Sequence, residues 1–223
     1  PVFAQLILAD EINRTPPKTQ AALLEAMAER QVTVAGRTLP LEPPFVVIAT
    51  QNPIEQEGTY PLPEAQLDRF MFSLWMDYPS RNEEARIVAE TPRIAQAQVD
   101  TVFTRTELLR SVDLIQRMPA PDLGTDYAVA LVRATRPRNP GAPEVTTRYV
   151  QWGAGPRAGQ YLMLGAKALA ALGGQPAPSC DHVRRAALPV LRHRVLVNYA
   201  ATGEGLDAAQ IIEQILRSVP APD

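Results

Sequence analysis

The sequence has little of what disulfide-rich, metal-binding or membrane-spanning proteins need. It contains one cysteine, Cys180, which excludes an internal disulfide framework and a site built from several cysteines. The two histidines, His182 and His193, lack the spacing of metal ligands. The sequence has no run of about 18 apolar residues, so no membrane span is expected, and the N-terminus lacks the pattern of a signal peptide. We therefore expect a cytoplasmic protein.

Excess positive charge is also missing from the sequence. The formal net charge is −2 and the pI is about 5.8, so the chain lacks the basic stripe of proteins that bind duplex nucleic acid. We therefore do not expect a nucleic-acid partner. Hydrophobic residues make up 46% of the 223 residues, which is enough for a packed core in one large domain or two small ones.

A third absence concerns phosphate binding. No segment matches G-x-x-x-x-G-K-[ST], the loop whose backbone amides, lysine and hydroxyl group hold phosphates and Mg²⁺. The Gly173-Gly174 pair is followed by Gln and Pro instead. The sequence also starts abruptly, because Pro1–Leu8 already lies inside a predicted buried strand. From these two features we expect the chain to be a fragment whose phosphate-binding loop lies upstream.

The first third of the sequence alternates between strand-like and helix-like patterns. The predicted elements are buried strands at Phe3–Ala9, Phe45–Thr50 and Met71–Met76, a β-hairpin at Gln31–Leu41, and helices from Thr15 to Arg30 and from Pro63 to Arg69. Short apolar runs without alternation are typical of strands buried on both faces of a parallel sheet. Strands joined by helices therefore favour an α/β fold.

After Pro79 only helical patterns follow. The predicted helices lie near Glu83–Glu90, Arg105–Arg117, Asp122–Thr135, Pro156–Leu172, Cys180–Val197 and Asp207–Arg217, with a proline-rich linker at residues 136–143. Asp207 and Gln210 have the spacing of a capping box at the last helix. We therefore predict two domains, an α/β part at residues 1–79 and a helical part at residues 80–223.

The pair Asp10-Glu11 follows directly after a predicted strand, where α/β proteins bind ligands. Nucleotide hydrolysis needs one carboxylate near Mg²⁺ and a second that orients or deprotonates the attacking water. Asn52 follows the next buried strand, and its amide could bind the same water or the terminal phosphate. Taken singly, each motif has an ordinary explanation: a solvated strand end for Asp10-Glu11, and a turn before Pro53 for Asn52.

Two arginines complete the set of candidate residues. Arg69 ends a predicted helix, where a cation can stabilise a phosphoryl group in a neighbouring subunit, or simply interact with the helix dipole. Arg157 follows Pro156 at a predicted helix N-terminus, where a cation opposes the dipole. That local cost favours a functional or anion-pairing role for Arg157, although a salt bridge within the same helix would also explain it.

Taken together, these motifs resemble the MoxR family of AAA+ ATPases. The similarity rests on the runs Leu8–Met27, Ala49–Phe70, Gly153–Ala158 and Val190–Arg194, and it covers nearly the whole chain. It implies a partial AAA+ (P-loop NTPase) parallel-sheet core followed by an all-helical lid domain. It also implies ATP and Mg²⁺ as cofactors and ATP-driven, chaperone-like remodelling or assembly of partner proteins.

The resemblance assigns a role to each candidate residue. Asp10 and Glu11 match the Walker B pair, for Mg²⁺ coordination and water activation, and Asn52 matches sensor 1. Arg69 matches the arginine finger, and Arg157 matches sensor 2 near the phosphates. The family also implies a ring, expected to be a hexamer, and partners with von Willebrand factor A domains. Gly155 is a departure, because family members usually carry Ser at that position; the cost is a few tenths of a kcal/mol in helix capping.

Two other functions compete with this hypothesis. By the same resemblance, the hairpin at Gln31–Leu41 matches the pre-sensor-1 hairpin that the family shares with magnesium chelatases and MCM helicases, which would favour a nucleic-acid motor. It carries a single cation, Arg37, whereas surfaces that track phosphates need several. The missing phosphate-binding loop would instead suit an interaction module that does not hydrolyse ATP, but the presence of all five candidate residues argues against such decay.

Overall fold

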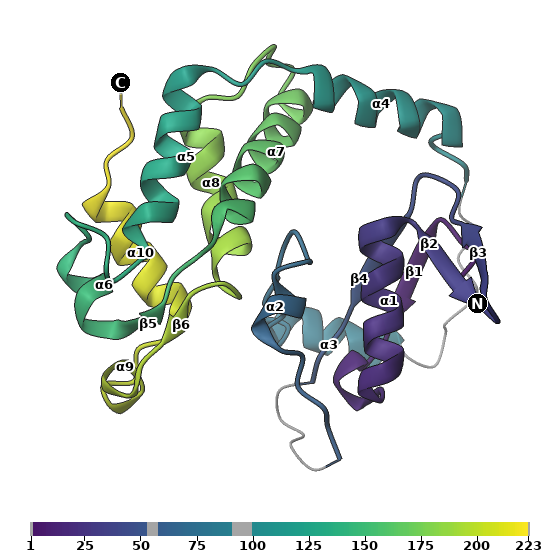
Figure 1. The fold of residues 1–223 in the computed structure, drawn as a ribbon, viewed down its shortest axis with the longest axis horizontal. Coiled ribbons are helices and arrows are strands. Elements are labelled where there is room, and N and C mark those ends of the chain that lie inside the picture. The colour runs from purple at the N-terminus through teal and green to yellow at the C-terminus, as the bar shows by residue number, and fades with distance from the viewer. Residues whose placement is uncertain (1, 53–57, 91–99, 223) are drawn as a thin grey trace.

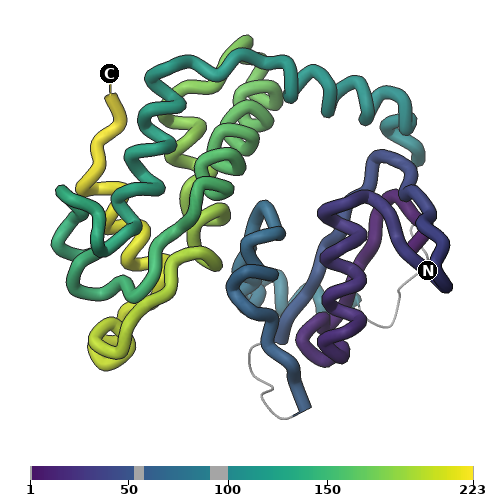
Figure 2. The backbone as a smooth tube through the Cα atoms, viewed as in Figure 1, coloured from purple at the N-terminus to yellow at the C-terminus, as the bar shows by residue number. Residues whose placement is uncertain are grey.

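The structure is a computed structural model that describes residues 2–52, 58–90 and 100–222. It confirms the expected α/β part followed by a helical lid. The early strands and helix α1 (Pro17–Glu29) gather at one end, and the helices from α5 (Asp122–Ala134) onward gather at the other (Figure 1). Helix α4 (Arg105–Arg117) reaches between them, and the two chain ends lie on opposite sides (Figure 2).

A parallel pair of strands forms the centre of the α/β part. Strand β1 (Leu6–Ala9) pairs with β4 (Val46–Ala49) in parallel register. The ends of both strands pack against a small core of Ile12, Leu24 and Leu62. The alternate side chains, such as Leu6 and Leu8, are exposed. The prediction that these strands are buried on both faces is therefore wrong for the described residues.

The predicted hairpin is confirmed. Strand β2 (Gln31–Val34) pairs antiparallel with β3 (Arg37–Pro40). Ala35 and Gly36 both have positive φ angles, as a two-residue hairpin turn of the favoured hand requires. The hairpin follows α1 directly, because Arg30 ends that helix in a left-handed conformation. At its other end α1 begins at Pro17, two residues after the predicted start at Thr15; Pro16 occupies the capping position, and Pro17 fits the first turn.

The segment after the short helix α2 (Glu64–Leu67) corrects another prediction. Residues 71–76 form no strand; they run towards the lid. The amide of Ser73 donates to the carbonyl of Pro189 at 2.8 Å, and the Phe72 ring lies against Gly165. The apolar run therefore docks on helices rather than entering the sheet. Helix α3 (Arg81–Glu90) follows it.

The lid holds most of the buried apolar side chains. Its remaining elements are α6 (Glu144–Tyr149), β5 (Val150–Trp152), α7 (Pro156–Leu172), α8 (Cys180–Leu191), β6 (Leu196–Val197), α9 (Tyr199–Gly203) and α10 (Ala208–Ser218). Leu131, Leu162 and Ile215 are fully buried among the helices. The predicted capping box of Asp207 and Gln210 is present.

The prediction that α8 extends to Val197 is wrong. The helix ends at Leu191, and Leu196–Val197 pairs with β5 instead. Helix α6 and this strand pair were not predicted, because both are short and their stability comes from packing on the lid. In the described ranges, no helix combines the length and apolarity that crossing a bilayer requires.

Candidate functional site

The carboxyl ends of β1 and β4 bring the first candidate residues together. The Thr50 hydroxyl donates to Asp10 Oδ1 at 2.5 Å, and the backbone amide of Glu11 donates to Thr50 Oγ1 at 2.9 Å. The amide of Ile12 also donates to the Thr50 carbonyl at 3.0 Å. Thr50 therefore ties the Asp10-Glu11 pair to the tip of the neighbouring strand, as the parallel register predicts.

Glu11 adopts an unusual backbone conformation, with φ of 47° and ψ of 52°. This left-handed conformation costs a residue with a side chain roughly 1–2 kcal/mol. Its carboxylate is partly exposed and lies 3.1 Å from Arg14 Nε. Strain of this kind concentrates at functional sites, because the surrounding structure holds a residue where a reaction needs it.

A polar frame lies under the strand tips and includes Asn52. The buried Asn13 side chain donates from Nδ2 to the Asn52 carbonyl at 3.3 Å. Its Oδ1 atom is buried and has no hydrogen-bond partner in the described part of the chain. Gln20, also buried, donates from Nε2 to the carbonyls of Ile12 and Tyr60. The frame ties the Asn52 backbone to the segment that follows Asp10 and Glu11. Asn13 and Gln20 were not singled out from the sequence.

The two candidate arginines lie in a second cluster. Arg157 Nη1 is 2.8 Å from Asp68 Oδ2, so the arginine at the start of α7 contacts the residue directly before Arg69. Arg69 itself donates from Nη1 to the Leu24 carbonyl of α1 at 3.3 Å. The structure thus brings Arg157 and the segment that carries Arg69 together. Arg69 and Arg157 are 88 positions apart in the sequence.

Arg194 joins the same cluster and was not predicted as a site residue. Its side chain is 1% exposed, and its Nε lies 2.7 Å from Asp68 Oδ1. The neighbouring His193 Nε2 is 3.1 Å from the Phe70 carbonyl. Burial and then the positive charge of Arg194 lower the pKa of His193 from 6.5 to about 4, so this imidazole is neutral near neutral pH. The sequence signal for this cluster is the Val190–Arg194 run.

The donor set at the strand tips fits Mg²⁺ better than most other metals. In residues 2–52, 58–90 and 100–222 no group of three or more metal-ligating side chains occurs. Asp10 offers one exposed carboxylate. Mg²⁺ commonly keeps several waters and uses one or two protein carboxylates together with substrate phosphates. A single aspartate at this edge is therefore a suitable partial ligand set.

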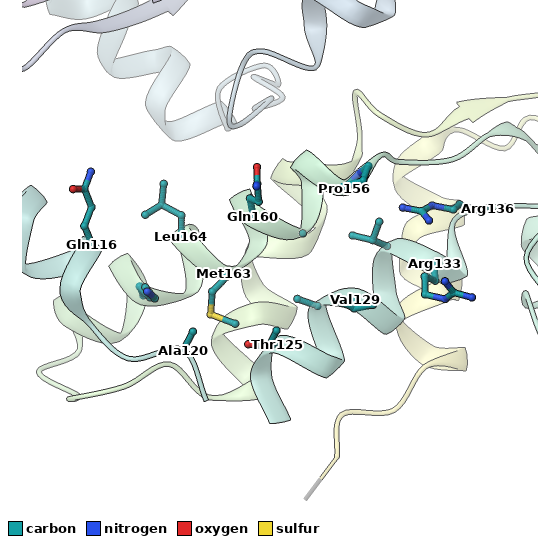
Figure 3. Close-up of a pocket in the computed structure, with 14 residues that line it drawn as sticks. Gln116, Ala120, Thr125, Val129, Arg133, Arg136, Pro156, Gln160, Met163 and Leu164 are labelled. Carbon is teal, nitrogen blue, oxygen red and sulfur yellow. The ribbon is translucent and has the colours of Figure 1, made fainter. Parts of the chain in front are cut away.

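A separate pocket of about 710 Å³ lies on the lid, between α4, α5 and α7 (Figure 3). Met163 of α7 points towards the start of α5, while Arg133 and Arg136 lie at the end of α5. Pro156 at the pocket's edge directly precedes Arg157. None of the strand-tip residues lines this pocket, so the chemistry suggested by Asp10 and Glu11 belongs elsewhere.

Comparisons with known proteins identify the family. A model of the ATPase family associated with various cellular activities (AAA) matches residues 1–72, and an AAA lid domain model matches residues 143–215. The protein YeaC of Bacillus subtilis is 42% identical over the whole chain, and Chaperone MoxR1 of Mycobacterium tuberculosis is 40% identical over the whole chain. The chain belongs to the MoxR family of AAA+ ATPases. It spans 67% of the length of YeaC and 59% of the length of MoxR1.

Two solved structures share the fold of this chain. A protein of Cytophaga hutchinsonii, described as a proposed ATPase, superposes with a TM-score of 0.92 at 40% identity, over the whole chain and 68% of that structure. An MCM homologue from Methanopyrus kandleri matches with a TM-score of 0.52 at 16% identity, over 96% of the chain and 38% of that structure. The second likeness shows a shared fold alone.

Proposed function

We propose that this chain is the hydrolytic portion of a MoxR-type ATPase that uses ATP to remodel or assemble partner proteins. The observation that carries the proposal is the tied arrangement of Asp10, Glu11 and Thr50 at two adjacent parallel strand ends. The likeness to a protein named as a chaperone supports the remodelling activity. ATP supplies the terminal phosphate that is transferred to water, and Mg²⁺ neutralises phosphate charge.

Each strand-tip residue would have a separate role in hydrolysis. Asp10 would hold Mg²⁺, because its exposed carboxylate suits a hard cation that keeps several waters. Glu11 would orient and deprotonate the attacking water, for which the strained backbone keeps its carboxylate next to Asp10. Asn52 would donate a side-chain hydrogen bond to that water or to the terminal phosphate. The buried frame of Asn13 and Gln20 supports this placement.

The arginines would act from a neighbouring subunit. Arg69 belongs to the cluster with Arg157, whereas Asp10, Glu11 and Asn52 form the group at the strand tips. Presentation of Arg69 to the next subunit's ATP, with Arg157 close to the same phosphates, accounts for the separation of the two groups. A finger arginine contributes about 10³-fold or more to turnover. This arrangement requires a ring, for which we propose six subunits.

Mixed rings test the division of roles. Full-length Arg69→Ala subunits and full-length Glu11→Gln subunits should each be nearly inactive alone. When mixed, a subunit with an intact Glu11 can meet an intact Arg69 from its neighbour, so part of the ATPase activity should return. The control mixes Arg69→Ala with the double variant Arg69→Ala/Glu11→Gln, which supplies no intact Arg69. Mixed rings that form by native mass, yet show no more activity than this control, would refute the assignment.

The finer parts of the proposal rest on the sequence. Partners with von Willebrand factor A domains come from the family resemblance. We also propose a cytoplasmic location, where ATP is available, and a boundary between the ATPase core and the lid after residue 79, where helical patterns begin. The two competing functions have less support. The MCM likeness is one of fold, and the hairpin β2–β3 offers only Arg37 to a phosphate backbone. A non-hydrolysing module would not need the strained Glu11.

A further inference from the structure

Asp68 is the shared partner of two arginines from the lid. Its Oδ1 lies 2.7 Å from Arg194 Nε, and its Oδ2 lies 2.8 Å from Arg157 Nη1. The three side chains differ in exposure: Arg194 is 1% exposed, Asp68 30% and Arg157 46%. One half of the cluster is therefore a buried anchor, and the other half is open to solvent and to a ligand.

Arg194 fixes the backbone on both sides of Arg69. Its Nη2 donates to the carbonyls of Asp68 and Phe70, both at 2.7 Å, and its Nη1 donates to the carbonyl of Met71 at 3.3 Å. A guanidinium group is planar and has five N–H donors in a rigid fork, so several bonds to one segment set its conformation. The Tyr161 hydroxyl also donates to the Arg69 carbonyl at 3.2 Å.

The Asp68 carboxylate supplies the charge that this arrangement needs. In the part of the chain that the structure describes, it is the carboxylate that pairs with Arg194, and a buried cation without a partner is strongly disfavoured. Arg157 lies in the first turn of α7, where the positive end of the helix dipole repels its positive charge. Asp68 offsets that repulsion and holds the Arg157 side chain towards the Arg69 segment.

We propose that Asp68 is a positioning residue for ATP hydrolysis: it joins Arg157 and the Arg69 segment into one unit, so that both arginines are presented together. This inference rests on the proposed function. Asp68 itself does not touch nucleotide; it acts through the two arginines. Because Arg157 is the exposed half of the cluster, it can exchange Asp68 for a phosphate oxygen while Arg194 keeps the segment in place.

The first test needs no nucleotide. In full-length Asp68→Asn the charge is lost but the side chain keeps its size. We expect backbone amides at residues 68–73 to exchange hydrogen for deuterium faster than in the wild type, with unchanged exchange in α10. Glu204→Gln is the matched control, because Glu204 pairs with Arg148 and Tyr149 on the far part of the lid. It should leave exchange at residues 68–73 and ATP turnover unchanged.

The second test separates positioning from folding. Asp68→Asn should lower kcat by about 100-fold, the scale expected when a catalytic group is displaced by about 1 Å. The KM for ATP should change much less. Mixing with Glu11→Gln subunits should restore activity, since the Asp68→Asn subunit retains its own Glu11. If Asp68→Asn does not fold, Asp68→Glu keeps the charge and moves it by one methylene; it should fold with a smaller loss of kcat.

The outcomes decide between the two proposals. Unchanged exchange at residues 68–73 together with unchanged kcat would overturn the role of Asp68. A loss of activity with a loss of rings, and without recovery on mixing, would show a merely structural role and would also overturn it. If wild-type protein binds ATP but does not hydrolyse it, the proposed function fails, whereas the exchange result still reports on the Asp68 cluster.

Discussion

Substitution of Gly153 by alanine should destabilise the lid, because the added methyl group has no room. A Cβ atom at this position would lie 2.3 Å from the Thr135 carbonyl oxygen, 2.6 Å from its carbon and 2.9 Å from Arg136 Cα. All three neighbours are backbone atoms at the end of α5, so no side-chain rotation relieves the clash. The loop cannot withdraw easily either. The Ala154 amide donates to Thr135 Oγ1 at 2.9 Å, and Arg136 Nε donates to the Ala154 carbonyl at 3.0 Å.

The size of the effect follows from this geometry. Overpacking in a closed site costs about 1–3 kcal/mol, and we expect the upper end because the backbone must move. At roughly 2–4 °C per kcal/mol for a protein of this size, Tm should fall by about 6–12 °C. Calorimetry or thermal unfolding followed by circular dichroism measures the change. Arg157 lies three residues after Ala154. Because the change displaces this loop, it should also reduce ATP turnover in the full-length protein.

Gly155 provides the matched control in the same loop. A Cβ there meets nothing within 4 Å, and its φ of −83° suits any residue. The free energy of unfolding of Gly155→Ala should therefore lie within about 0.5 kcal/mol of the wild-type value. Gly155→Ser should be a few tenths of a kcal/mol more stable, because serine caps the helix better. If Gly153→Ala and Gly155→Ala have the same Tm, the close approach of this loop to α5 is not as described.

Three further predictions follow from individual residues. His193, beside Arg194, Arg192 and Asp68, has a native pKa near 4 against 6.5 when unfolded, so the unfolded chain binds a proton first as the pH falls. As the pH falls from 6.5 to 4, the free energy of unfolding should drop by about 3 kcal/mol. His193→Gln should remove this part of the pH dependence in urea titrations. A drop in the variant as large as in the wild type would contradict the role of His193. Glu11→Gly should be about 1 kcal/mol more stable than Glu11→Ala, because only glycine adopts the left-handed conformation without strain; equal midpoints in urea would show that Glu11 is not strained. The 223-residue chain alone should show no magnesium-dependent ATPase activity, because it lacks the phosphate-binding loop; robust phosphate release by the purified chain would disprove this.

Much of the fold follows from local sequence signals. The helix Pro156–Leu172 was predicted with its observed ends; Pro156 suits its first turn, and in the structure Gly173 caps its C-terminus. The hairpin β2–β3 was also predicted, since Gly36 lies between two alternating runs. These signals act within a few residues, so no knowledge of the tertiary structure is needed to recognise them.

The errors arise where distant contacts decide the structure. The run Met71–Met76 has a strand-like composition, but its partners are Pro189 and Gly165 in the lid, more than 90 positions away. The exposed faces of β1 and β4 depend on which layers cover the sheet, and a hydrophobic pattern does not report this.

Local sequence signals predicted the strand-tip part of the candidate site but not the Asp68 cluster. Asp10, Glu11 and Asn52 could be placed together because the ends of parallel strands meet at one edge. The Asp68 cluster could not be placed, because it joins residues 68, 157 and 194, and their spacing has no local pattern. Two sequence signals belong to this cluster, the Val190–Arg194 run and Arg157 at a helix N-terminus, and neither indicates Asp68. The alternative considered for Arg157 was a salt bridge within its own helix, whereas the structure pairs Arg157 with Asp68, which lies outside α7.

The Glu11→Gln variant of the full-length protein separates the binding of ATP from its hydrolysis. An equilibrium titration with a fluorescent ATP analogue and a steady-state assay of phosphate release should be run on the same preparation. We expect ATP affinity close to that of the wild type and turnover reduced by about 100-fold or more, because the variant lacks the general base. Turnover equal to that of the wild type, or a loss of ATP affinity as large as the loss of turnover, would contradict the proposed role of Glu11.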